Sequence, residues 1–131
     1  MEISYWMTRN PKCVRPRDTL AKARDLMTRG GFRRLPVVEG DNMLVGMISE
    51  SDVRQHLGHL AETRVNAAMA SNLLAISEFD TAEEAAEVML QHKIGGLPVI
   101  RGARVVGIVS TTDLPKALVR VVKATGDILN E

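Results

Sequence analysis

The chain has 131 residues, of which 45% are hydrophobic, 25% are charged and 3% are aromatic, and its formal net charge is +1. These fractions are typical of a globular domain and exclude a disordered or fibrous chain. The single Cys13 excludes an internal disulfide, and no apolar run approaches the roughly 20 residues of a membrane span, so we expect a cytoplasmic protein without a membrane partner.

Two stretches of the chain carry the same predicted elements in the same order. Short apolar runs beside turns predict strands, and apolar residues at helical spacing predict helices. A further helix is expected to begin at Ser49 and again at Ser110. The other predicted elements are a strand (12–15), a helix (19–29) and two strands (35–38, 43–48), followed by a strand (74–77), a helix (81–91) and two strands (97–100, 105–109).

The two stretches are copies of one unit of about 60 residues, because the sequence matches itself at an offset of 62 and then of 61. We assign residues 1–61 to the first repeat and residues 62–131 to the second. A unit of this size is marginal alone, so we expect the copies to share a core. The clearest matches are Leu35-Pro36-Val37-Val38 with Leu97-Pro98-Val99-Ile100, and Val45-Gly46-Met47-Ile48-Ser49 with Val106-Gly107-Ile108-Val109-Ser110.

The duplicated pattern resembles a tandem pair of CBS domains (a Bateman module). The resemblance rests on Met7-Thr8-Arg9-Asn10-Pro11, on both Leu-Pro-Val strands and on Gly-h-h-Ser-x-x-Asp ending at Asp52 and at Asp113, where h is apolar. The opening segment is similar to that of stand-alone bacterial and archaeal CBS-pair proteins, including the CBS part of acetoin-utilisation proteins. The resemblance implies an α/β (α+β) fold in which two β-α-β-β-α repeats pack sheet to sheet with pseudo-twofold symmetry.

The resemblance also implies two clefts that bind an adenosine-containing ligand. In each, the Asp of the motif would hold the ribose hydroxyls, and the hydroxyl side chains beside it would hold ribose or phosphate. A carboxylate accepts hydrogen bonds from both hydroxyls of a diol, and a helix N-terminus favours phosphate. The same Ser-x-x-Asp pattern also serves as a plain helix start, which leaves a purely structural role open. The residues assigned in this way are Asp113 with Ser110 and Thr112, and Asp52 with Ser49 and Ser51.

The cationic residues predict that the two clefts differ. Arg33 and Arg34 precede the first Leu-Pro-Val strand, where Gly95 and Gly96 precede the second, and Lys93 is the nearest cation of the second repeat. Arginine suits phosphate, so the cleft that these arginines serve should take the more anionic ligand. We favour Asp113 as their ribose partner. Two alternatives stay open: Asp52 as that partner, and ordinary surface charges.

The adenine would pack against apolar side chains of the short first strand and of the Leu-Pro-Val strand. Because aromatic residues are so few, aliphatic packing is expected. The candidates are Val14, Pro36, Pro98 and Ile76. Each of them could equally be a core residue, and for Val14 and Ile76 the core is the stronger interpretation.

We therefore predict a non-enzymatic regulatory module that binds AMP, ADP, ATP or S-adenosylmethionine, with no catalytic residue, no metal site and no required cofactor. The apolar stripe within residues 114–129 predicts a homodimer, and a regulatory role implies an effector protein as a further partner. A dimerisation module with non-binding clefts is the alternative. A nucleic-acid-binding protein is a third hypothesis, because residues 1–34 hold nine Lys or Arg against three Asp or Glu.

Overall fold

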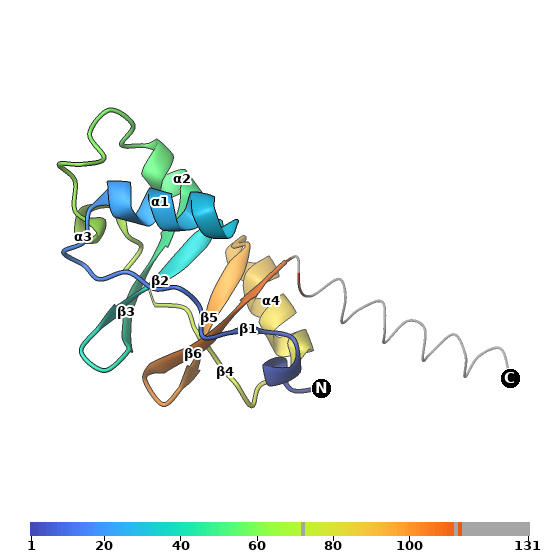
Figure 1. The fold of residues 1–131 in the computed structure, drawn as a ribbon. Coiled ribbons are helices and arrows are strands. Elements are labelled where there is room, and N and C mark those ends of the chain that lie inside the picture. Colours follow the sequence, from blue (N-terminus) through green and yellow to red (C-terminus); the bar gives the residue numbers. More distant parts are fainter. Residues whose placement is uncertain (72, 112, 114–131) are drawn as a thin grey trace, which may run out of the picture.

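The computed structural model describes residues 1–71, 73–111 and 113. Both halves of this part contain a long helix followed by a two-stranded hairpin (Figure 1). The strand and helix predictions for these pairs are confirmed. The elements in chain order are η1 (a 3-10 helix, Ile3–Tyr5), β1 (Thr8–Arg9), α1 (Leu20–Gly30), β2 (Arg34–Glu39), β3 (Met43–Ser49), α2 (Glu50–Arg54), α3 (Val65–Ala68), β4 (Ile76–Ser77), α4 (Ala82–His92), β5 (Gly96–Arg101) and β6 (Arg104–Ser110).

The two long helices begin in the same way because each has a threonine cap. Thr19 Oγ1 accepts a hydrogen bond from the Lys22 N–H, and Thr81 Oγ1 accepts one from the Glu84 N–H at 3.1 Å. The Glu84 carboxylate accepts in return from the Thr81 N–H, which completes a capping box. These bonds satisfy N–H groups that have no partner inside a helix. Both helices are followed at once by a left-handed residue, which turns the chain into the hairpin strand.

The cap of α4 has a measurable effect on stability. We expect Thr81→Ala to lower the free energy of unfolding by about 1 kcal/mol, because the Glu84 N–H loses its acceptor. Urea denaturation followed by circular dichroism measures this change. Thr28→Ala is the control, since Thr28 is exposed on α1, and it should stay within about 0.5 kcal/mol of the wild type. Equal losses in both variants would contradict the role of the cap.

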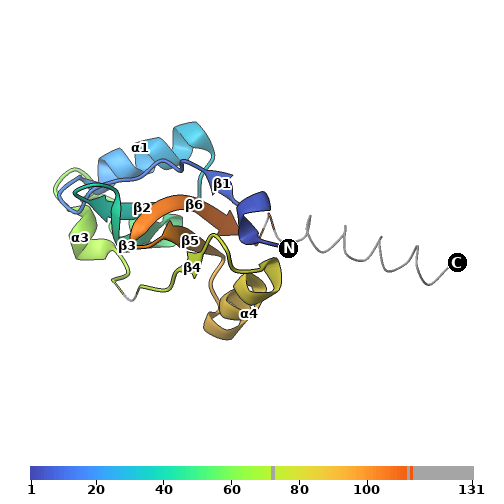
Figure 2. The same ribbon diagram turned by 90° about the horizontal axis from the view of Figure 1, so that it is seen from below.

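The strands form one six-stranded sheet, in the order β2-β3-β6-β5-β4 with β1 also paired to β6. This confirms the predicted fold class, a mixed α and β fold. The hairpins of the two repeats meet in this sheet where Met43 of β3 pairs with Arg104 of β6. Their remaining edges are occupied, because β1 pairs with β6 at Thr8 and Ile108, and Ala70 bridges to Met47 of β3. In the view of Figure 2 the strands lie between α1 and α4.

Among the described residues, the hydrophobic interior consists of two clusters, one for each repeat, where we expected a single shared core. Each cluster nevertheless contains a segment from outside its own helix and hairpin. Ile3 and Met7, at the start of the chain, pack with the second repeat, and Val65, which lies just before the second repeat's strands, packs with the first. The Ile3 N–H donates to the Asp80 carbonyl at 2.7 Å, which fastens this leading segment to the second repeat. We call this arrangement the exchange of leading segments.

Several predictions concern residues outside those that the structure describes. They are the helix expected after Ser110, the apolar stripe of residues 114–129 and the ligand role of Thr112. The strand expected over residues 12–15 is reduced to one bridge, between Val14 and Val37 of β2. Within the described segments, no helix combines the length and the apolar character needed to cross a bilayer.

Candidate functional site

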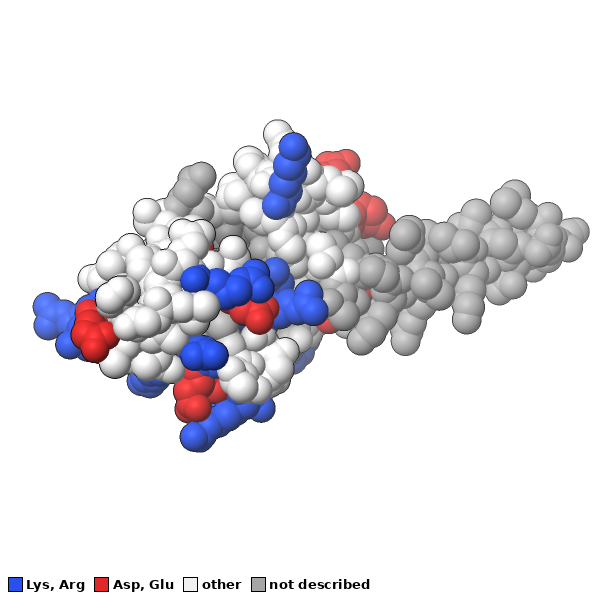
Figure 3. All heavy atoms as spheres, turned by 90° about the horizontal axis from the view of Figure 1, so that it is seen from above, with Lys and Arg blue, Asp and Glu red and all other residues white. Residues whose placement is uncertain are grey.

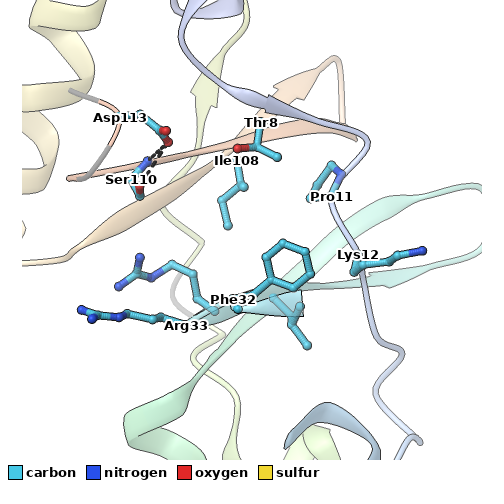
Figure 4. Close-up of a pocket in the computed structure, with 11 residues that line it drawn as sticks. Thr8, Pro11, Lys12, Phe32, Arg33, Ile108, Ser110 and Asp113 are labelled. Atoms are coloured by element: carbon cyan, nitrogen blue, oxygen red, sulfur yellow. Dashed lines mark hydrogen bonds between the residues drawn. The ribbon is translucent and has the colours of Figure 1, made fainter. Parts of the chain in front are cut away.

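A cavity of about 340 Å³ opens between the two repeats, which is within the size range of small-ligand sites. Three segments line it (Figure 4): the chain around β1 with Thr8, Pro11 and Lys12, the turn from α1 into β2 with residues 31–35, and the end of β6 with Ile108, Ser110 and Asp113. The first two segments belong to the first repeat and the third to the second. A molecule in this cavity therefore contacts both repeats at once.

The polar end of the cavity is built by Ser110 and Asp113. The Ser110 backbone N–H and its hydroxyl both donate to Oδ2 of Asp113, each at 3.0 Å. Two donors on one oxygen fix the orientation of the carboxylate. Among the described residues, no hydrogen bond reaches the other oxygen, Oδ1, so this acceptor is available to a ligand. A diol is a suitable donor for it.

Ser49 and Asp52 reproduce this arrangement in the first repeat but do not line the cavity. The Ser49 N–H and hydroxyl donate to Oδ2 of Asp52 at 2.9 and 2.8 Å, and the Asp52 N–H donates to Ser49 Oγ at 3.1 Å. This is the capping box of α2, and it shows the helix-start role that the sequence left open. Ser51 is exposed on the same short helix. The structure thus brings Asp113, and not Asp52, to the same cavity as Arg33 and Arg34.

Two guanidinium groups face the polar end of the cavity. Arg33 is exposed and Arg34 is half-buried. Burial lowers the pKa of Arg34, and the positive charge of Arg33 lowers it further. Among the residues that the structure describes, no carboxylate forms an ion pair with either side chain. On the molecular face seen in Figure 3, Lys and Arg side chains lie in the middle with an acidic side chain beside them, whereas Arg33 and Arg34 themselves line the cavity. This part of the cavity is therefore suited to an anion.

Lys93, the remaining predicted phosphate ligand, lies elsewhere. It is the exposed left-handed residue that ends α4, and it does not line the cavity. Lys12 lines the cavity instead, from the segment after β1. In Figure 4 its side chain extends away from Arg33. Lys12 was not among the predicted ligand contacts. The excess of cations in residues 1–34, to which it belongs, was the feature of the sequence that could have indicated it.

The apolar wall of the cavity consists of residues that the sequence analysis did not name. In Figure 4 the Phe32 ring lies below Ile108 and Pro11, and the Arg33 side chain extends away from it. An aromatic side chain is thus present where only aliphatic packing was expected. The four predicted adenine contacts are in the hydrophobic interior and do not line this cavity: Val14, Pro36, Pro98 and Ile76.

The single cysteine of the chain directly follows Lys12, which lines the cavity. The Cys13 thiol donates to the Pro11 carbonyl, and burial raises the pKa of this thiol. A raised pKa keeps the sulfur in its neutral, weakly nucleophilic form. Within the described segments, no three His, Cys, Asp or Glu side chains come together as a metal site would require.

Comparison with known proteins identifies the family. The model of the CBS domain matches this chain twice, over residues 2–59 and 65–120. The chain belongs to the CBS-domain family. Among relatives of this CBS pair, the CBS domain-containing protein YhcV of Bacillus subtilis is 32% identical over 111 residues, which cover 82% of the chain and 79% of YhcV. MJ1225 of Methanocaldococcus jannaschii is 30% identical over 129 residues, and the CBS pair spans only about half of it, 46%.

Solved structures share the fold of the CBS pair. A protein assigned to acetoin utilization (AcuB) from Vibrio cholerae superposes with a TM-score of 0.84 at 25% identity, covering 97% of this chain and 96% of that one. The CBS pair of MJ0100, in complex with 5′-methylthioadenosine and S-adenosyl-L-methionine, gives 0.83 at 23% identity, covering 90% and 95%. CBSX2 in complex with AMP gives 0.80 at 22% identity, covering 92% and 97%.

Proposed function

We propose that this CBS pair is a non-enzymatic regulatory module that binds an adenosine phosphate in the cavity between its repeats. One observation carries the proposal: the cavity joins the Ser110–Asp113 carboxylate of the second repeat to the guanidinium groups of Arg33 and Arg34 from the first, which form no ion pair with a described residue. The proposal is also supported by the family, in which the solved pairs of MJ0100 and CBSX2 hold adenosyl compounds.

Each part of the ligand has a matching part of the cavity. The ribose hydroxyls donate to the Asp113 carboxylate, while the phosphate accepts from Arg33 and Arg34. The adenine packs against Phe32 and Ile108 at the apolar end, where ring stacking adds to burial. Three cations and one carboxylate line the cavity, so an anionic nucleotide is favoured over S-adenosylmethionine, which carries a sulfonium.

Binding regulates because the ligand contacts both repeats. A ligand that binds one arrangement of the repeats more tightly shifts the population toward it. We propose that an effector protein senses this shift and that the module acts as a homodimer in the cytoplasm. Light scattering measures the mass of the particle with and without nucleotide. A dimer that binds no nucleotide would instead support the dimerisation module.

Titration calorimetry with AMP, ADP, ATP, adenosine and S-adenosylmethionine tests the proposed function. We expect AMP to bind with a dissociation constant below about 1 mM, and Asp113→Ala to weaken it about tenfold, as for loss of a charged hydrogen-bond partner. Asp52→Ala is the matched control: both carboxylates accept the same two bonds from their serine, but only Asp113 lines the cavity. Absence of binding by all five compounds, or equal effects of the two variants, would refute the proposal.

A further inference from the structure

The side chain of Arg34 crosses from the first repeat to the second and lies against the backbone of Gly95 and Gly96. A β-carbon built on Gly95 would be 2.6 Å from Nη2 of Arg34. One built on Gly96 would be 2.6 Å from Cδ and 2.9 Å from Nη1 of the same side chain. Real β-carbons do not approach other atoms so closely, so the guanidinium occupies the space that side chains at 95 and 96 would fill.

We call the space beside Gly95 and Gly96 the recess. The two repeats differ here, because the first repeat has side chains at the matching positions. Gly95 and Gly96 correspond to Arg33 and Arg34 in the repeat alignment. In the sheet, Arg34 pairs with Ser49, and Gly96 pairs with Ser110. The Arg34 side chain therefore leaves its own hairpin and reaches the strand pair that carries Ser110. Two glycines in the second repeat allow one arginine of the first to occupy the junction.

Within the part of the chain that the structure describes, the cation in this recess has no carboxylate as a counter-charge. Arg34 is half-buried, Arg33 stands next to it in the chain, and neither has a carboxylate partner within the described segments. Repulsion between neighbouring guanidinium groups in a partly desolvated place is relieved when an anion binds between them. An uncharged ligand brings no such gain.

We infer that Gly95 and Gly96 determine specificity: their recess holds the Arg34 guanidinium at the Ser110–Asp113 end of the cavity, so that phosphorylated adenosine is selected over adenosine. The inference rests on the proposed function and adds the residues that set its selectivity. Arg34 would contact the phosphate, whereas Gly95 and Gly96 are positioning residues that act through Arg34.

The apolar end provides a matched comparison, because another glycine makes room there. A β-carbon on Gly30, the last residue of α1, would collide with the ring of Phe32. Gly30→Ala therefore displaces an apolar side chain of the cavity, while Gly96→Ala displaces a charged one. Gly30→Ala should weaken the binding of AMP and of adenosine by the same factor. Gly96→Ala should weaken the binding of AMP alone.

A double-mutant cycle on the full chain tests the inference, with AMP and adenosine as the calorimetric probes. We expect Gly96→Ala to lower the ratio of AMP to adenosine affinity about tenfold. In the Arg34→Ala background the same substitution should leave the ratio unchanged, because the group that it displaces is gone. Gly30→Ala should leave the ratio at the wild-type value. The inference is overturned if Gly96→Ala weakens both compounds equally, or if its effect persists without Arg34.

Thermal unfolding without ligand separates this inference from the proposed function. Gly96→Ala should lower the melting temperature in the wild-type background and should not lower it in the Arg34→Ala background. One outcome is that the melting temperatures show coupling between Arg34 and Gly96 while the wild type binds neither AMP nor adenosine. This outcome would refute the proposed function and would show that Arg34 occupies the recess. Binding of AMP to the wild type without any coupling between Arg34 and Gly96 refutes the inference and leaves the proposed function standing.

Discussion

Removal of both guanidinium groups in the Arg33→Ala/Arg34→Ala variant should weaken AMP binding about 100-fold or more and should change adenosine binding little. A hydrogen bond between charged partners contributes about 1.5–3 kcal/mol, and the variant loses at least two such interactions with the phosphate. Adenosine has no phosphate, so its contacts with the apolar end and with Asp113 are retained. Titration calorimetry of the two compounds at one salt concentration measures both effects.

A weaker affinity for AMP could also result from the lower net charge of the variant. A second double variant tests this alternative explanation. Arg24 and Arg54 are exposed on α1 and α2, and neither lines the cavity. The Arg24→Ala/Arg54→Ala variant therefore lowers the net charge by the same amount without changing the cavity. We expect its AMP affinity to stay within about twofold of the wild type, since exposed distant charges are screened by salt. Similar losses in the two double variants would point to general electrostatic attraction, as in the nucleic-acid hypothesis.

Ile3→Ala should lower the free energy of unfolding by about 2–5 kcal/mol, the usual cost of truncating a large buried aliphatic side chain. Ile3 is fully buried, yet the cluster in which it packs belongs to the second repeat. The substitution leaves a void between the leading segment and that core. Urea denaturation measures the change, and an unaltered slope would show that the unfolded state is unaffected.

Tyr5 is the control for this prediction, because it belongs to the same 3-10 helix as Ile3 but is 75% exposed. We expect Tyr5→Ala to stay within about 0.5 kcal/mol of the wild type. If Ile3→Ala were as stable as Tyr5→Ala, the leading segment would contribute nothing to the second repeat. The exchange of leading segments would then have no energetic importance.

The long elements could be predicted from the sequence because their signals are local. Thr19 and Thr81 stand where caps belong, and Gly31 supplies the left-handed residue at the end of α1. Two short elements, β1 and α3, could not be predicted. β1 has two residues, and its partner Ile108 lies about a hundred positions along the chain, so no local periodicity indicates it. The helix α3 consists of a single turn, which is also too short to show a periodic pattern in the sequence.

The polar residues of the cavity could be predicted from the charges and the internal repeat of the sequence, whereas its apolar residues could not. Arg33, Arg34, Ser110 and Asp113 were named because they break or repeat a pattern, and the structure brings them together. The four predicted adenine contacts do not line this cavity, and all four residues of the Leu-Pro-Val-Val strand are buried. Such a strand shows no alternation that separates a cavity wall from the interior. Phe32 was missed because its place in the cavity depends on how α1 meets β2.

The exchange of leading segments limits how the two repeats can move. Each cluster holds a side chain carried on a segment that leads into the other repeat's fold, as Ile3 and Val65 show. A hinge that swung the repeats apart would pull these side chains out of close-packed interiors, which costs several kcal/mol for each. Shear, in which packed elements slide by small amounts, keeps them buried. Relative motion of the two repeats that keeps Ile3 and Val65 buried is therefore confined to small sliding displacements.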